Sequence, residues 1–373
     1  MNSKKIIIVG PAHPFRGGIA AFDERMAVDL QQLGHTVEIV NFTTQYPGFL
    51  FPGKTQFTSD PAPATLKITR LLSSINPFSW ITTASYIRKQ QPDLVILRFW
   101  IPFMGPALGS IARLLGKKIK IIGFVDNLIP HEKRIGDSLL SNYFVNGCSG
   151  FITLSNQVKD EIARFTNREC LMSPHPVYDH YGDKTTKEES CKQLNLNPEI
   201  NYILFFGFIR NYKGLDLLIK AFSESNLRSK NYKLLIAGEF YEDEKQYLEL
   251  INSLQLSDDI ELHSHYIPDA EIKHYFGACD LVVQPYRSAT QSGISQLAYH
   301  FEKPMVVTNV GGLPEIVKHK QTGYVTEVNP TAIAKAMNEF TEGDIHCFDE
   351  AIRQEKTKYT WSHLSQTILH FIP

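Results

Sequence analysis

The stretch KIIIVGPAHPFRGGIAAFDERMAVDLQQLGHTVEIV, residues 5–40, decides the fold class of this chain. It begins with a continuous apolar run, passes through a glycine-containing turn into a segment with apolar residues at helical spacing, and ends in a second apolar run. Continuous apolar runs are typical of parallel strands buried on both faces. The spacing predicts a helix that ends at Gly34, a C-cap residue, and whose buried face is formed by Ile19, Phe22, Met26, Leu30 and Leu33. These residues predict one βαβ unit.

The same alternation continues along nearly the whole chain, which predicts an α/β fold. Further strands are expected at residues 93–99, 120–125 and 150–155, and, after a proline-punctuated and charged stretch, at 201–207, 232–238, 260–265, 280–285 and 304–309. Two doubly wound parallel-sheet domains follow from this pattern. We expect a first domain over 1–178, a connection over 179–200, a second domain over 201–355 and a C-terminal helix over 356–373 that docks on the first domain.

Composition excludes several classes of protein. The 373 residues are 43% hydrophobic and 21% charged, with 23 Gly and 20 Pro, which excludes disordered, collagen-like and disulfide-scaffold chains. The longest uncharged apolar stretch, residues 99–112, is too short and too interrupted by Pro102 and Pro106 to span a bilayer. The first apolar run is shorter than that of a secretory signal, so we expect a cytoplasmic protein. Its five cysteines are scattered singly, which favours reduced thiols and no metal site.

Charge is distributed unevenly along the chain. Residues 1–178 carry 19 Lys and Arg against 12 Asp and Glu, a net charge of +7, whereas residues 179–373 carry 19 against 27, a net charge of −8. The basic half suits an anionic membrane surface or a phosphorylated acceptor, and a chance imbalance between two ordinary surfaces explains it equally well. Within it, Arg98, Phe99 and Trp100 end a strand and form either an acceptor- or membrane-facing surface or a buried strand end.

The stretch FFGFIRNYKGLDLLIKAF, residues 205–222, carries the strongest indication of chemistry. Its strand ends at Gly207, and Arg210 and Lys213 follow before a helix begins near Gly214. Ligands of doubly wound folds bind at the carboxyl ends of the strands, and two cations there suit a diphosphate whose charge increases as a bond to it breaks. The alternative is a solvated loop with ordinary surface cations.

Two other helix starts are candidate ligand contacts. Gly17 and Gly18 open the first helix, where backbone amides and the helix dipole favour an anion or a sugar, although the spacing is neither a dinucleotide fingerprint nor a P-loop. Hydroxyl and amide groups crowd the start of a helix near residue 293, and these residues are Thr290, Gln291, Ser292, Gly293 and Ile294. An ordinary N-cap explains the Ser and Thr there equally well.

Taken in order, these segments resemble the retaining GT-B nucleotide-sugar glycosyltransferases of glycosyltransferase family 4. The resemblance covers essentially the whole chain and rests on the GGIA turn, the HPV segment at the domain junction, the G-x-x-R-x-x-K-G loop, LLIAGE, ACDLVVQP and EKPMVVTNVGGLPEIV. It implies two Rossmann-like domains that face each other across a cleft, a donor held mainly by the second domain, an acceptor bound mainly by the first, and no required metal. It also implies that Arg210 and Lys213 contact the donor diphosphate and that Gly17, Gly18, Gly207 and Gly238 approach the donor.

The chain departs from the family pattern at two places. The family's paired glutamates fall at Ala289 and Leu297 here, so that Gln291, Ser292 and Gln296 are the polar substitutes, without the charge assistance of a carboxylate. The histidine expected after the strand at 120–125 is replaced by Asp126. Asp126 orients a sugar hydroxyl, assists the acceptor proton, or belongs to an ordinary turn without a catalytic role, and the nearby His131 is a second candidate base.

The resemblance therefore implies a metal-independent retaining hexosyltransferase that needs no cofactor and uses a nucleotide diphosphate-sugar as co-substrate. The expected acceptor is a glycan or lipid-linked glycan in surface polysaccharide or glycolipid biosynthesis, with peripheral contact to the inner membrane and no nucleic-acid partner. A GT-B nucleotide-sugar epimerase and a catalytically degenerate sugar-nucleotide-binding scaffold are the alternatives.

Overall fold

A computed structural model describes residues 3–48, 55–58, 61–130 and 135–372 of the chain. The chain divides into two compact units. Unit 1 contains residues 1–175 and 360–373, and unit 2 contains residues 176–359. Each unit is built around one parallel sheet, which confirms the expected pair of Rossmann-like α/β domains.

Unit 1 contains a seven-stranded parallel sheet in the order β3-β2-β1-β4-β5-β6-β7. Its strands are β1 (Lys5–Val9), β2 (Thr36–Thr44), β3 (Lys67–Ser73), β4 (Leu94–Phe99), β5 (Lys120–Val125), β6 (Gly150–Thr153) and β7 (Cys170–Met172). Its α-helices are α1 (Gly18–Gln32), α2 (Pro77–Gln90), α3 (Gly105–Leu115), α4 (Asp137–Val145), α5 (Asn156–Ala163) and α14 (Trp361–Leu369). The central strands β1 and β4 are the most apolar, because helices cover both faces of the sheet.

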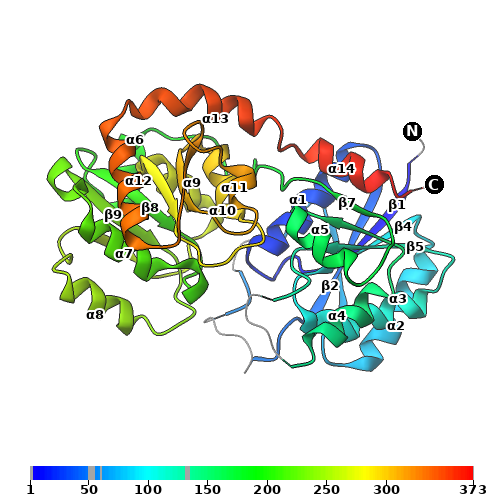
Figure 1. The fold of residues 1–373 in the computed structure, drawn as a ribbon. Helices are drawn as coiled ribbons and strands as arrows, with labels where there is room; N and C mark the ends of the chain where they lie inside the picture. Colours follow the sequence, from blue (N-terminus) through cyan, green and yellow to red (C-terminus); the bar gives the residue numbers. More distant parts are fainter. Residues whose placement is uncertain (1–2, 49–54, 59–60, 131–134, 373) are drawn as a thin grey trace. The chain divides into compact units, whose positions relative to one another are not determined.

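Helix α1 follows the predicted pattern over most of its length. Phe22, Met26 and Leu30 are buried against the sheet, and the chain turns at Gly34 with a φ of 89°. Leu33 was expected on the same buried face, but this expectation is wrong: it is 47% exposed because it lies beyond the end of the helix. Helix α14 packs beside α1, where the Ser365 hydroxyl donates a hydrogen bond to Asp29 (Figure 1).

Unit 2 contains a six-stranded parallel sheet in the order β10-β9-β8-β11-β12-β13. Its strands are β8 (Asn201–Phe206), β9 (Tyr232–Ala237), β10 (Ile260–His263), β11 (Leu281–Gln284), β12 (Met305–Thr308) and β13 (Gly323–Thr326). Its α-helices are α6 (Lys187–Leu194), α7 (Leu215–Glu224), α8 (Lys245–Ser253), α9 (Asp269–Ala278), α10 (Gly293–His300), α11 (Leu313–Ile316), α12 (Pro330–Glu342) and α13 (Asp349–Lys356).

Both sheets have a switch point, where the strand order reverses direction. It lies between β1 and β4 in unit 1 and between β8 and β11 in unit 2. Ligands of doubly wound folds bind beyond the carboxyl ends of the strands at such points. The segments that follow these four strands are therefore the places to examine for function.

None of the helices in the described part of the chain combines the length and the apolar character that crossing a bilayer requires.

Candidate functional site

The switch point of unit 2 brings together residues that are far apart in the sequence. Gly207 follows β8 with a φ of 99°, and a Cβ added there would lie 3.2 Å from Lys213 Nζ and 3.3 Å from Ile294 Cδ1. Gly238, which follows β9, packs so closely that an added Cβ would lie 2.1 Å from the Gly207 carbonyl oxygen. Gly207 thus packs near Lys213, Ile294 and Gly238, and glycine is required at Gly207 by its positive φ and at Gly238 by the close backbone.

Lys213 is the most unusual side chain of this site. It ends the short 3-10 helix η3 (Asn211–Lys213) and is only 9% exposed. Its ammonium lies 5.8 Å from the ring centroid of the buried Tyr286, which follows β11. Burial, and secondarily the charge of Arg210, lowers the pKa of Lys213 to about 7. No carboxylate forms an ion pair with Lys213 in the part of the chain that the structure describes.

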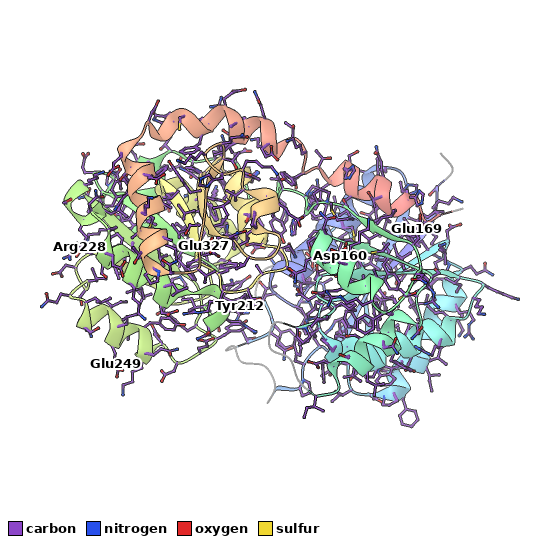
Figure 2. The ribbon with its side chains drawn as sticks, viewed as in Figure 1. Asp160, Glu169, Tyr212, Arg228, Glu249 and Glu327 are labelled. Carbon is purple, nitrogen blue, oxygen red and sulfur yellow. The ribbon has the colours of Figure 1, made fainter. Side chains whose placement is uncertain are left out.

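Arg210 provides the second positive charge on this loop. Its guanidinium lies over the ring of Tyr241, with the central carbon 5.1 Å from the ring centroid. Tyr212, which is labelled in Figure 2, lies between the two cations in the sequence. Among the described residues, no Asp or Glu is ion-paired to Arg210 either. Two neighbouring cations without a paired carboxylate are arranged to attract an anion.

A second set of contacts fixes the loop that carries these cations. Arg287 forms a bidentate ion pair with Asp216 of α7, at 2.9 and 2.7 Å, and donates a hydrogen bond to the Asn211 carbonyl. Its backbone amide donates to the Tyr212 carbonyl. A Cβ added at Gly214, which has a φ of 69°, would lie 2.1 Å from the carbonyl oxygen of Pro285. The loop after β8 is therefore held against the segment that follows β11.

The start of helix α10 lies beside the loop that follows β8, since Ile294 of this helix is next to Gly207. Ser292 is the N-cap of this helix, and its side chain makes no cap hydrogen bond. Thr290 is buried nearby along the chain. Gln296 is fully buried, yet neither its amide nitrogen nor its amide oxygen has a hydrogen-bond partner in the described structure, and Gln291 Oε1 is likewise unpartnered. A buried amide of this kind costs stability unless a ligand satisfies it.

The positions of the family's glutamates hold apolar residues that are buried. Ala289 and Leu297 are each only 4% exposed. Gln296, which precedes Leu297, is therefore the unsatisfied polar group closest in sequence to the second glutamate position.

The switch point of unit 1 has a different character. Arg98 on β4 is 2% exposed and lies between the rings of Phe22 and Phe124, at 4.3 and 4.2 Å. Its guanidinium donates a hydrogen bond of 2.7 Å to Asp126 and lies 3.6 Å from Asp23 Oδ1. Burial raises the pKa of Asp23 well above its usual range, although Arg98 opposes the shift. One guanidinium is thus enclosed by two buried carboxyl groups.

This cluster decides between the two interpretations of the strand end at Arg98–Trp100. All three residues are buried, so they form a packed strand end and not an acceptor- or membrane-facing surface. Asp126 is ion-paired and buried, and burial raises its pKa despite Arg98. Its catalytic role remains a prediction. His131, the second candidate base, lies outside the described residues.

Gly17 and Gly18 lie at the start of α1, with Gly17 as an N-cap at a φ of 107° and no side-chain cap bond. Gly17 and Gly18 therefore stand at the helix start that the sequence predicts, and their role toward a donor remains a prediction. Sequence reasoning did not identify Asp216, Tyr286 and Arg287. The ion pair of Asp216 and Arg287 joins two segments that lie far apart in the chain, and no spacing rule indicates such a pair.

Comparison with known proteins gives matches over both units. The family described as "Glycosyltransferase Family 4" matches residues 16–171, and the family described as "Glycosyl transferases group 1" matches residues 186–359. A D-inositol 3-phosphate glycosyltransferase from Thermobifida fusca is 25% identical over 341 residues, which cover 83% of this chain and 77% of that protein.

Solved structures share the fold over almost the entire chain. The sucrose-phosphate synthase of Thermosynechococcus elongatus has a TM-score of 0.76 at 15% identity, and 98% of each chain is covered. Anabaena HepE in complex with UDP and glucose has a TM-score of 0.73 at 14% identity, with 98% of each chain covered. The two family matches, one in each unit, and the shared architecture identify this chain as a glycosyltransferase with the GT-B fold that is similar to family 4.

Proposed function

We propose that this glycosyltransferase moves a hexosyl group from a nucleotide diphosphate-sugar to an acceptor hydroxyl, with retention of the anomeric configuration and without a metal ion. One observation carries the proposal: Lys213, buried beside Gly207 and close to Arg210, has no paired carboxylate among the described residues. Burying an uncompensated ammonium costs free energy, which a bound diphosphate would offset.

The two cations would act mainly as the donor bond breaks. When the bond between the anomeric carbon and the diphosphate oxygen lengthens, negative charge develops on the leaving oxygen. Donors that are already in place stabilise this charge more in the transition state than in the ground state. The ion pair of Arg287 with Asp216 would keep the loop in place while this happens.

The neutral residues at positions 289 and 297 of unit 2 affect how retention of the anomeric configuration can be explained. Ala289 and Leu297 occupy the places where a carboxylate would be expected, so the proposal includes no covalent carboxylate nucleophile at these positions. Retention would follow if the acceptor oxygen attacks from the face that the diphosphate leaves, with the leaving phosphate accepting the acceptor proton. The acceptor in this proposal is a glycan or a lipid-linked glycan of surface polysaccharide or glycolipid biosynthesis.

A nucleoside diphosphate donor is supported by the neighbouring fold of HepE, which was crystallised with UDP and glucose. Gln291 and Gln296 are the side chains that we assign to hydroxyl groups of the donor, because their buried amide atoms lack partners in the described structure. An amide both donates and accepts hydrogen bonds, which suits a sugar hydroxyl.

The test is donor turnover and donor binding with a panel of UDP-, GDP- and ADP-sugars. Arg210→Ala and Lys213→Ala should each lower kcat/KM by about 100- to 1000-fold, as expected for the loss of one pre-positioned charge donor. Lys220→Ala is the matched control, because Lys220 is an exposed cation of the adjoining helix α7 and should leave turnover unchanged. Chelator should have no effect on any of these proteins.

Two outcomes would contradict the proposal. If the Lys213→Ala protein turned over donor at the parental rate, Lys213 would not stabilise the charge of the leaving diphosphate as proposed. Binding of a nucleotide sugar by the parent without transfer to any acceptor in a cell extract would instead identify a sugar-nucleotide-binding scaffold.

A further inference from the structure

The loop that carries Arg210 and Lys213 is held from two sides at one residue, Asn211. The Asn211 carbonyl accepts a hydrogen bond of 2.7 Å from the guanidinium of Arg287, on the segment that follows β11. The Asn211 backbone N–H donates to a carboxylate oxygen of Glu242, on the segment that follows β9. Both bonds involve a charged side chain, and such hydrogen bonds are stronger than those between neutral groups. The peptide groups on both sides of Asn211 are therefore fixed in direction.

Both terminal nitrogens of Arg287 form hydrogen bonds within the protein. Nη1 donates to Asp216 Oδ1 at 2.9 Å as well as to Asn211, and Nη2 donates to Asp216 Oδ2 at 2.7 Å. The backbone N–H of Arg287 also donates to the Tyr212 carbonyl at 2.7 Å. Because Asp216 balances its charge, Arg287 is not arranged to attract an anion as the two cations of the loop are. It binds instead two consecutive carbonyl groups of the loop.

Glu242 is held in turn by its own segment. The hydroxyl of Tyr247, a residue of α8 that is only 3% exposed, donates a hydrogen bond of 3.2 Å to Glu242 Oε2. The backbone N–H of Tyr241, which precedes Glu242, donates to the Ile209 carbonyl at 3.0 Å. The segment after β9 therefore contacts the backbone of the loop one residue before Arg210 and again one residue after it.

These contacts matter more for the placement of the loop than for the stability of the fold. The side chains of Arg287 and Asp216 are 32% and 25% exposed, and ion pairs at such exposure contribute little to the free energy of unfolding. Glu242 is half-buried as well. A charge donor that is fixed in advance stabilises a developing charge without reorganising, and a displacement of about 1 Å costs about 100-fold in rate. A small movement of this loop would therefore affect turnover strongly.

We propose that Arg287 and Glu242 are positioning residues of sugar transfer. They bind both backbone polar groups of Asn211, so that Arg210 and Lys213 present their charges to the leaving diphosphate from a fixed loop. This role depends on the proposed function of the two cations and adds the residues that control their placement. Each positioning residue acts through the backbone of the loop, and neither is assigned a contact with the donor.

Steady-state kinetics of the full chain tests the proposal, with the nucleotide sugar that the parent turns over fastest among UDP-, GDP- and ADP-sugars. Arg287→Gln should lower kcat by about 10- to 100-fold and leave KM for the donor within about threefold, because the two cations remain but their placement is lost. Arg287→Lys should restore part of kcat, since a lysine keeps the charge and can donate to one carbonyl. Tyr247→Phe, which removes the hydrogen bond to Glu242 and changes no charge, should lower kcat by a smaller factor.

Glu242→Ala separates positioning from simple electrostatics. Removing a carboxylate beside two cations raises the positive potential of the loop, so electrostatics alone predicts tighter binding of the anionic donor and no loss of turnover. Positioning predicts instead that kcat falls by at least about tenfold. The matched control is Arg228→Gln, because Arg228 forms a 2.8 Å ion pair with Asp259 in the segments that precede β9 and β10. This control should keep the parental kcat.

Parental kcat in both Arg287→Gln and Glu242→Ala would overturn the positioning role, provided that Lys213→Ala has lost turnover. Parental turnover by Lys213→Ala would contradict the proposed function of the cations instead, so the two failures are distinguishable. A higher KM at unchanged kcat in Arg287→Gln would also overturn the positioning role, because Arg287 would then contribute to donor binding. Should Arg287→Gln unfold at a lower temperature than the parent, an unchanged kcat in Glu242→Ala alone overturns it.

Discussion

The switch points of the two sheets have the same topology and opposite electrostatics. In unit 1, the cation at this place, Arg98, is enclosed by Asp23 and Asp126 and by two aromatic rings. In unit 2, Lys213 and Arg210 have no ion-paired carboxylate among the described residues. The difference teaches that the fold supplies the location of a site, and that charge compensation decides whether the location is structural or available to an anionic ligand.

The largest effect that this comparison predicts is on stability. Arg98→Met leaves two buried carboxyl groups without their cation, so the free energy of unfolding should fall by about 3–5 kcal/mol. Denaturant unfolding measures this. Lys213→Met is the matched experiment in unit 2 and should leave stability unchanged or raise it, because it removes an uncompensated buried charge. Equal losses in the two variants would mean that the two clusters do not differ as described.

The pH dependence of donor binding should be the next largest effect. Burial lowers the pKa of Lys213 to about 7 in the unliganded protein, and the diphosphate binds best to the ammonium form. Donor affinity should therefore fall as pH rises above about 7, by up to about tenfold per pH unit. Calorimetric titration across this range measures it, and Lys213→Met should bind weakly with a flat profile.

The same shift has a consequence for folding with a defined sign. The unfolded chain holds the Lys213 proton up to its ordinary pKa of 10.5, while the folded protein releases it near 7. Between these values the unfolded state binds more protons, so the contribution of Lys213 to stability becomes more favourable as pH rises. For donor binding, an affinity of the parent that does not change with pH would show that the protonated Lys213 side chain does not bind the diphosphate.

The smallest effect concerns Gln296. Gln296→Leu removes a buried amide that has no partner in the described structure, so stability should rise by about 1–2 kcal/mol. Donor affinity should fall by about tenfold if the amide binds a donor hydroxyl, a loss similar to that of one hydrogen bond. Thermal unfolding and donor titration of the same variant separate these two effects. Unchanged donor affinity would make Gln296 a packing residue only.

The sequence predicted the fold class and most of the strands. The buried strands have continuous apolar runs, and ten of the thirteen observed strands were expected from them. Strands β3, β7 and β13 were missed. All three lie at the edge of a sheet: β3 is partly exposed and contains Lys67 and Arg70, and most residues of β7 and β13 are only half-buried. Short or edge strands carry little apolar pattern because only part of their surface is buried.

The candidate site was predicted in part. The G-x-x-R-x-x-K-G spacing pointed to Gly207, Arg210 and Lys213, because the residues of a single turn are close in the chain. The contact of Gly207 with Ile294, and the clamp of Asp216 by Arg287, join separate loops and needed the folded sheet. No sequence pattern indicated that Asp23 shares Arg98 with Asp126, since each side chain comes from a different element.

The sequence by itself determined that the chain builds two parallel α/β sheets, because local apolar periodicity reports which segments are buried. It also determined where two cations follow a strand and that residues 1–178 are net basic. Only the tertiary structure decided which charges are compensated: Arg98 is enclosed by two buried carboxyl groups, whereas Lys213 is buried without an ion-paired carboxyl group among the described residues. The reason is physical, since burial and ion pairing depend on neighbours brought together by strand order and helix packing, which no local pattern encodes.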